Sequence, residues 1–164
     1  MKSVALRALV ALGALLVLGS VNFAIAGKEH TRRDGEIVYL PLVPVDPRSL
    51  VQGDYMALRF SLARDIEQRD ADSKRAEHEG EVAYAAVTLD DRHIATLAGD
   101  GAAAPMKLRY RIRKGRVWLG TNAFFFEEGS AERFRKARYG QFRVDRASGD
   151  AVLVGLRDER LAAL

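Results

Sequence analysis

The chain has 164 residues, with 26 Lys and Arg against 22 Asp and Glu and a formal net charge of +4. It has no cysteine, which excludes disulfides, thiolate metal sites and cysteine nucleophiles. Two basic and no acidic residues lie in the first 27 positions, so the other 137 residues, enough for one domain, carry 24 basic and 22 acidic side chains. This balance argues against nucleic-acid binding, which uses a clustered basic surface.

The N-terminal segment 1–27 predicts a membrane anchor. Residues 8–26 form a run of 19 residues without charge, preceded by Lys2 and Arg7. At about 1.5 Å per residue the run nearly spans the ~30 Å hydrocarbon core of a lipid bilayer. A cleaved signal peptide is the alternative, since Ala24-Ile25-Ala26 has the small-x-small form of a cleavage site. Both interpretations export the rest of the chain, and the Leu and Val content favours a retained transmembrane helix.

After the anchor, residues 28–36 are charged and predict a juxtamembrane connector. A soluble domain is then expected over 37–164. Its first strand, 37–43, is apolar and β-branched, and Pro41 confines it to a sheet edge or a bulge.

A proline-rich corner follows at 44–54. Pro44 and Pro47 favour extended, non-helical backbone, and Gly53-Asp54 is a turn dipeptide. A strand is expected over 55–62, with Met56, Leu58 and Phe60 on its apolar face and Tyr55, Ala57 and Arg59 on the other. The bend predicts that the charged side chains of the corner meet in one polar cluster; these are Asp46, Arg48 and Asp54.

The segment 64–81 is densely charged, with eleven Asp, Glu, Lys or Arg among its eighteen residues, and predicts a solvated helix or loop outside the core. Strands are expected at 82–89, 92–97, 106–113, 117–119, 141–144 and 151–156, with a break at 99–105, a buried strand end at 124–126 and a short helix at 131–137 capped by Ser130. The fold class is therefore mainly β (α+β): an N-terminal transmembrane helix, then a curled antiparallel sheet or small barrel with one or two short helices.

One predicted strand carries a basic row on its outward face, made of Lys107, Arg109, Arg111 and Arg113. A solvated face that discourages edge pairing is the simpler interpretation. An anion-binding or partner-binding site is the alternative.

The segment Gly53-Asp54-Tyr55-Met56-Ala57-Leu58-Arg59-Phe60 resembles the motif that gives the GDYXXLXY family its name, with Phe60 in place of the final tyrosine. Val21-Asn22, Lys28-Glu29 and the segment 120–129 also resemble that family's pattern. The resemblance implies a small bacterial protein of the inner membrane, with one anchor and a β-rich domain in the periplasm, and it implies no particular reaction. The motif residues are Asp46, Pro47, Arg48, Gly53, Asp54, Tyr55, Leu58 and Phe60.

Catalytic patterns are few. His30, His78 and His93 lack metal-ligand spacing, so neither a metal nor another cofactor is expected. The segment 47–55 faintly resembles a box of the type I signal peptidases, but Pro44 stands where their nucleophilic serine would be. We therefore expect a non-enzymatic module that binds a partner, with an integral membrane protein as the expected partner. The alternative is an envelope hydrolase that uses Ser49 near Asp46 and Asp54.

Overall fold

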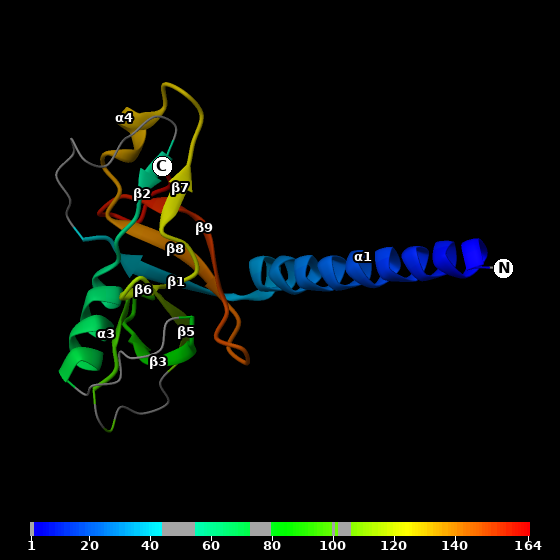
Figure 1. Ribbon diagram of the computed structural model, residues 1–164. Coiled ribbons are helices and arrows are strands. Elements are labelled where there is room, and N and C mark those ends of the chain that lie inside the picture. The colour runs from blue at the N-terminus through cyan, green and yellow to red at the C-terminus, as the bar shows by residue number, and fades with distance from the viewer. Residues whose placement is uncertain (1, 44–54, 73–79, 100, 102–105) are drawn as a thin grey trace.

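The computed structural model describes residues 2–43, 55–72, 80–99, 101 and 106–164. Its first element is a single long helix, α1 (Lys2–Asp34), which projects from the β-rich domain as a straight rod (Figure 1). The part Leu9–Asp34 is long and apolar enough to cross a membrane, and its most apolar stretch packs against nothing else in the protein. The predicted N-terminal apolar helix is confirmed.

The helix does not stop at the expected connector. It continues through residues 28–34, and Gly35 alone separates it from the first strand. Gly35 donates its N–H to the Thr31 carbonyl at 3.0 Å and closes the last turn. A Cβ at Gly35 would overlap that carbonyl oxygen and lie 3.0 Å from the Val144 nitrogen, so only glycine fits where the helix meets the sheet.

The described residues of the domain form three sheets, each of them antiparallel. The first has the order β1-β8-β9, the second pairs β2 with β7, and the third has the order β4-β3-β5-β6. The strands are β1 (Glu36–Pro41), β2 (Tyr55–Ala57), β3 (Val82–Leu89), β4 (Ala95–Leu97), β5 (Met106–Arg113), β6 (Arg116–Trp118), β7 (Ala123–Phe125), β8 (Tyr139–Val144) and β9 (Ala151–Arg157). As Pro41 predicts, β1 is an edge strand of its sheet.

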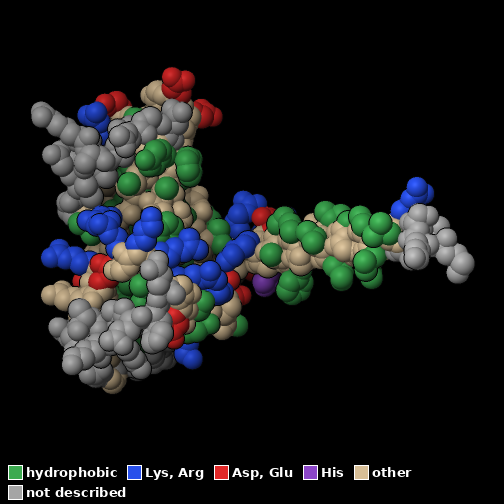
Figure 2. All heavy atoms as spheres, in the orientation of Figure 1, with side chains coloured by type: hydrophobic (Ala, Val, Ile, Leu, Met, Phe, Trp, Pro, Cys, Tyr) green, Lys and Arg blue, Asp and Glu red, His purple; other side chains and the backbone are tan. Residues whose placement is uncertain are grey.

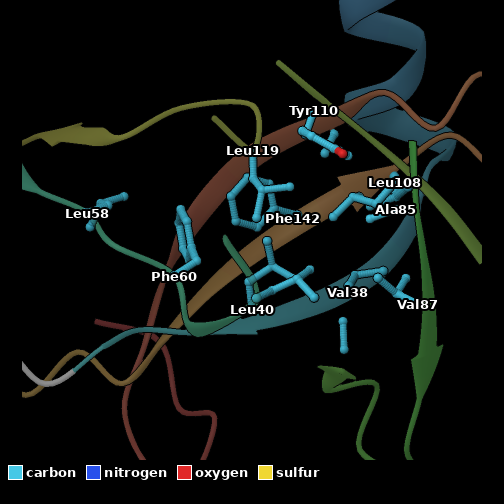
Figure 3. Packing of buried hydrophobic residues seen from close by; sticks show 14 of the residues in the cluster. Val38, Leu40, Leu58, Phe60, Ala85, Val87, Leu108, Tyr110, Leu119 and Phe142 are labelled. Carbon is cyan, nitrogen blue, oxygen red and sulfur yellow. The ribbon is translucent and has the colours of Figure 1, made fainter. Parts of the chain in front are cut away.

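The first and third sheets join into one curled surface. Tyr39 of β1 forms a parallel bridge with Ile94, next to β4, and its N–H donates to the His93 carbonyl at 2.9 Å. The inner side of this surface holds the main core, where Leu40, Leu108 and Phe142 are fully buried. Figure 3 shows Phe142 between Phe60 and Leu119, so that side chains from distant parts of the chain meet in one cluster. The prediction of a curled antiparallel sheet is confirmed.

The charged segment after the motif strand is a helix, α3 (Ser61–Asp72), within the described residues. The prediction that it stays outside the core is wrong. Leu62 and Ile66 lie four positions apart on one face of α3 and are 1% and 0% exposed, because a helix needs only a narrow apolar stripe to pack on a sheet. The expected strand 55–62 is correspondingly shorter. The ladder with β7 ends at Ala57 and helix α3 begins at Ser61, although the predicted alternation of burial persists through Phe60, which forms an isolated bridge with Leu42.

Two predictions near β7 also need correction. Phe125 is 75% exposed instead of buried, because within the described residues β7 pairs only with the short β2 and no other strand covers it. The following helix α4 covers only Ala131–Phe134, and Ser130 makes no side-chain cap; its hydroxyl donates instead to the Glu127 carbonyl at 2.6 Å. Phe134 is the residue that α4 buries, against the rings of Phe124 and Phe126.

Candidate functional site

The corner residues of the predicted site, Asp46, Pro47, Arg48, Ser49, Gly53 and Asp54, lie outside the described residues. The polar cluster expected there stays a prediction. The structure describes the second half of the motif, where Tyr55, Leu58 and Phe60 occupy three different environments. The candidate site is therefore described from these three side chains of the motif strand.

Phe60 is the buried end of the motif. It is 4% exposed, forms an antiparallel bridge with Leu42, and packs edge-on against the Phe142 ring at a centroid distance of 5.3 Å. The space for its ring depends on Gly140 of β8, where a Cβ would lie 2.8 Å from Phe60 Cε1 and 3.0 Å from Phe142 Cε2. The motif is thereby fixed to the three-stranded sheet by packing.

Leu58 fixes the motif to a second part of the domain. Its N–H donates to the Asn122 carbonyl at 2.7 Å, and its side chain is 4% exposed. The turn that brings Asn122 there passes through Gly120, whose φ is +71° and whose added Cβ would lie 2.9 Å from the Ala151 carbonyl oxygen. The segment 119–122 is therefore held close to β9 and against the motif at the same time.

Tyr55 faces outward. On the two-stranded sheet it lies directly across from Phe125, and the two rings are tilted at a centroid distance of 5.9 Å. Their exposed fractions are 38% and 75%. An exposed aromatic pair on a short ribbon provides rigid contact area of the kind that is enriched at protein interfaces.

Beside the motif lies a cleft of about 350 Å³ between α3, β6 and residues 58–60. Leu58, Phe60 and Leu119 line it with buried apolar side chains. Three exposed arginines, Arg59, Arg64 and Arg116, also line this cleft.

Among the described residues that line this cleft, positive charge is in excess, with three arginines and one acid. No ion pair or hydrogen bond of the side chains of Arg59, Arg64 and Arg116 occurs within the described part of the chain. The one acid that lines the cleft, Glu67, accepts the Val117 N–H at 2.8 Å and so helps to hold α3 against β6. The cleft is thus an apolar floor with a cationic rim, suited to a ligand that is both acidic and apolar.

The cleft offers little chemistry for a reaction. Its hydroxyl group belongs to Thr121, which donates to the Ala123 carbonyl at 3.0 Å. Among the residues that the structure describes, no group of three or more His, Asp or Glu side chains is arranged to hold a metal ion.

Sequence reasoning missed these three arginines as a group. Arg59 was placed on the outer strand face, Arg64 opened the charged segment, and Arg116 followed a hairpin turn. More than fifty positions separate Arg116 from the other two, so local periodicity carries no signal that joins them. Only the packing of α3 on β6, which needs Leu62 and Ile66 in the core, brings them together.

The junction between α1 and the domain is a second organised region. Lys28 of α1 and Arg109 of β5 each form an ion pair with Asp150, at 3.0 and 2.7 Å. Burial alone would raise the pKa of the Asp150 carboxyl. The hydrogen bonds from Lys28 and Arg109 and the positive charges of these two residues outweigh burial, so that the pKa is lowered. Arg143 of β8 also donates to the Gly35 carbonyl at 2.9 Å, so the helix end is held both by β8 and by the turn between β8 and β9 that contains Asp150.

A model of a protein family described as "GDYXXLXY protein" matches residues 17–156 of the chain. The match therefore begins inside the apolar helix and ends in the last strand. Searches of curated proteins and of solved structures found no match.

Proposed function

The chain belongs to the GDYXXLXY family, and we propose that it is a single-pass protein of the bacterial inner membrane whose periplasmic domain binds an integral membrane protein. In this proposal α1 is retained as the anchor, and the domain is a recognition module without an enzymatic reaction. The ligand is an extramembrane segment of the partner that presents an acidic side chain next to apolar ones.

The anchor supports this proposal through its connection to the domain. Helix α1 runs without a break from its apolar part into the contacts at Lys28 and Gly35. A domain held in this way cannot rotate freely on a linker. It presents the same face to its neighbours in the membrane, and confinement to the bilayer raises its effective concentration for a membrane partner.

The observation that carries the proposal is the cleft beside the motif. Its rim contributes three guanidinium groups, each able to form two parallel hydrogen bonds to a carboxylate, above the apolar floor of Leu58, Phe60 and Leu119. The exposed rings of Tyr55 and Phe125 lie on the neighbouring ribbon, which the same motif forms. The cleft and the exposed aromatic pair are therefore both built in part from residues of the family motif.

The test is site-specific photocrosslinking in intact cells. Asn122 has an exposed side chain and lines the cleft, so a photoreactive phenylalanine analogue at this position reports its occupant. Lys136, exposed and not among the residues that line this cleft, is the matched control position. We expect position 122 to crosslink to one integral membrane protein that position 136 does not reach.

The charge requirement is tested in the same assay. Replacing Arg64 and Arg116 by glutamine should reduce the crosslink from position 122 at least fivefold, whereas the same change at Arg160, which is exposed and not part of the cleft, should leave it unchanged. Identical products from positions 122 and 136, or a crosslink that is insensitive to the arginines, would contradict the proposal.

A further inference from the structure

A second and larger cavity of about 560 Å³ lies where α1 meets the domain. It is a groove between the last apolar turns of the helix and the strands β5 and β6. The side chains that matter are Phe23 and Lys28 from α1, Arg109, Arg111 and Arg113 from β5, and Trp118 from β6. Figure 2 shows Lys and Arg side chains gathered where the apolar rod joins the domain.

The groove carries an excess of positive charge. Four cations line it, and the one carboxylate among its lining residues, Asp150, is already bound to Lys28 and Arg109. Arg113 lies over the Trp118 ring with its guanidinium carbon 5.0 Å from the ring centroid. Arg111 is exposed and has no ion-pair partner within the described ranges. Three members of the basic row of β5, Arg109, Arg111 and Arg113, therefore form one wall of a groove, whereas Lys107 does not line it.

The position of the groove along α1 matches the surface of a bilayer. A hydrocarbon core of about 30 Å accommodates roughly 20 helical residues, so a span that begins near residue 8 ends near Gly27. Phe23 is 84% exposed and lies within the last turn or so of that span, and Lys28 follows it. The arginines of β5 and Trp118 then lie at the level of the lipid headgroups, where Trp and basic residues are favoured.

We propose that this groove binds the phosphate headgroup of an anionic membrane phospholipid. The phosphate, together with any further negative charge of the headgroup, binds to Arg111, Arg113 and Lys28. The upper part of an acyl chain packs against Phe23 and Trp118. The inference rests on the membrane anchoring proposed above, but not on the partner. The groove shares Trp118 with the cleft beside the motif, but its arginines are different ones.

The chemistry of the lining favours a lipid over a soluble anion. Guanidinium groups bind phosphate oxygens through paired hydrogen bonds, which suits either ligand. Phe23, Ala24 and Trp118 add an apolar side to the groove that inorganic phosphate would leave unused. That apolar side is continuous with the membrane-crossing part of α1, so a lipid next to the helix reaches the arginines without leaving the bilayer.

The test uses the full-length chain in micelles of a neutral detergent. Trp118 is the only tryptophan of the chain and lines the groove, so its fluorescence responds to binding there. It also lines the cleft beside the motif, so the variants of Arg111 and Arg113, which line the groove and not that cleft, assign the signal to the groove. Phosphatidylglycerol, phosphatidylcholine and inorganic phosphate are titrated in parallel. Native mass spectrometry counts bound lipids independently, since Arg113 touches the fluorophore. We expect saturable binding of phosphatidylglycerol, at least tenfold weaker binding of phosphatidylcholine, and no competition by millimolar phosphate.

Two variants with the same change of charge decide the role of the groove. Arg111→Gln with Arg113→Gln should weaken phosphatidylglycerol binding about 25-fold, at roughly fivefold for each basic residue near an anionic surface. Lys136→Gln with Arg160→Gln, outside the groove, should change it less than twofold. Equal affinity for both lipids, or an unchanged affinity of the first variant, would overturn the proposal. Competition by phosphate at the same concentration as lipid would show a soluble-anion site instead.

The lipid-binding measurements do not depend on the protein partner. If the lipid proposal fails while position 122 still crosslinks to an integral membrane protein, only the groove has been misinterpreted. If the crosslink fails while phosphatidylglycerol binds, the lipid-binding proposal is supported and the partner-binding proposal is refuted.

Discussion

The contact between the motif and the three-stranded sheet can be tested by adding one methyl group at Gly140. In Gly140→Ala the new Cβ would lie 2.8 Å from Phe60 Cε1, 3.0 Å from Phe142 Cε2 and 3.2 Å from Leu153 Cδ1. All three distances are shorter than ordinary van der Waals contact, and Phe60 and Phe142 are 4% and 0% exposed. Forcing a methyl group into such a core costs about 1–3 kcal/mol of the free energy of unfolding. At roughly 4 °C per kcal/mol, the Tm should fall by roughly 4–12 °C.

Gly155 provides the matched control, because it lies in the neighbouring strand β9 and its added Cβ would meet nothing within 4 Å. Gly155→Ala should leave the Tm unchanged or raise it slightly, because the change should alter the free energy of unfolding by between zero and about +1 kcal/mol. The assay is thermal unfolding of the full-length chain in neutral detergent. It is followed by Trp118 fluorescence, since α1 would dominate a far-ultraviolet signal.

A double-mutant cycle then identifies Phe60 as the side chain that is displaced. Phe60→Leu removes Cε1, so Gly140→Ala should cost at least about 0.5 kcal/mol less in that background than in the wild type. If the two changes are additive within about 0.3 kcal/mol, or if Gly140→Ala is as mild as Gly155→Ala, the motif is not fixed to the sheet in this way.

Four further predictions follow from the junction, the anchor and the corner. The pKa of Asp150 is lowered in the folded state from its ordinary value of 3.8. The wild type should therefore exceed Asp150→Asn in free energy of unfolding by about 1 kcal/mol above pH 5, and this difference should vanish as acidification protonates the carboxyl. If urea unfolding gave the same dependence of stability on pH for both proteins, the ion pairs of Asp150 with Lys28 and Arg109 would be refuted. Mass spectrometry of envelope fractions should find no mature N-terminus at Gly27. Gly53→Val should lower stability by roughly 1–3 kcal/mol, which an unchanged melting curve would contradict. Ser49→Ala should complement a deletion strain fully, whereas loss of complementation with normal folding would favour the hydrolase.

The strands of the third sheet were predictable because their signal is local. In β5 every second residue is apolar, and burial follows that alternation from Met106 to Ile112. Its hairpin to β6 turns at Lys114-Gly115, where φ is +51° and +69°, which is the backbone that a glycine-containing two-residue turn adopts. Pattern and turn chemistry point to the same structure here, so sequence alone was sufficient.

Helix α3 shows where local reasoning failed. Counting charges over 64–81 hid the fact that Ile66 and the preceding Leu62 share one face of a helix that begins at Ser61. Both are in the core because the curled sheet offers them a surface, and this tertiary partner is not visible in the segment itself. The exposure of Phe125 has the opposite cause: an apolar residue on a ribbon that nothing covers.

The candidate site was half predictable. The motif directed attention to Tyr55, Leu58 and Phe60, and the structure places the last two in the core and the first on the surface. The cationic rim of the cleft needed the fold, because Arg116 lies more than fifty positions from Arg59 and Arg64. In the groove at α1 the arginines of β5 were visible in the sequence as a basic row, and the fold was needed to place them beside Phe23 and Lys28 of α1. The corner charges Asp46, Arg48 and Asp54 stay a prediction from the sequence.

The central claim, a domain held on the periplasmic face of the inner membrane by α1, is tested most directly by labelling a single cysteine. The chain has none of its own, so Lys136→Cys introduces a unique and exposed thiol. Spheroplasts are treated with a membrane-impermeant maleimide and the membranes are then washed with carbonate. We expect the labelled protein to stay in the washed membrane pellet. Labelling only after lysis, or labelled protein released into the supernatant, would contradict it.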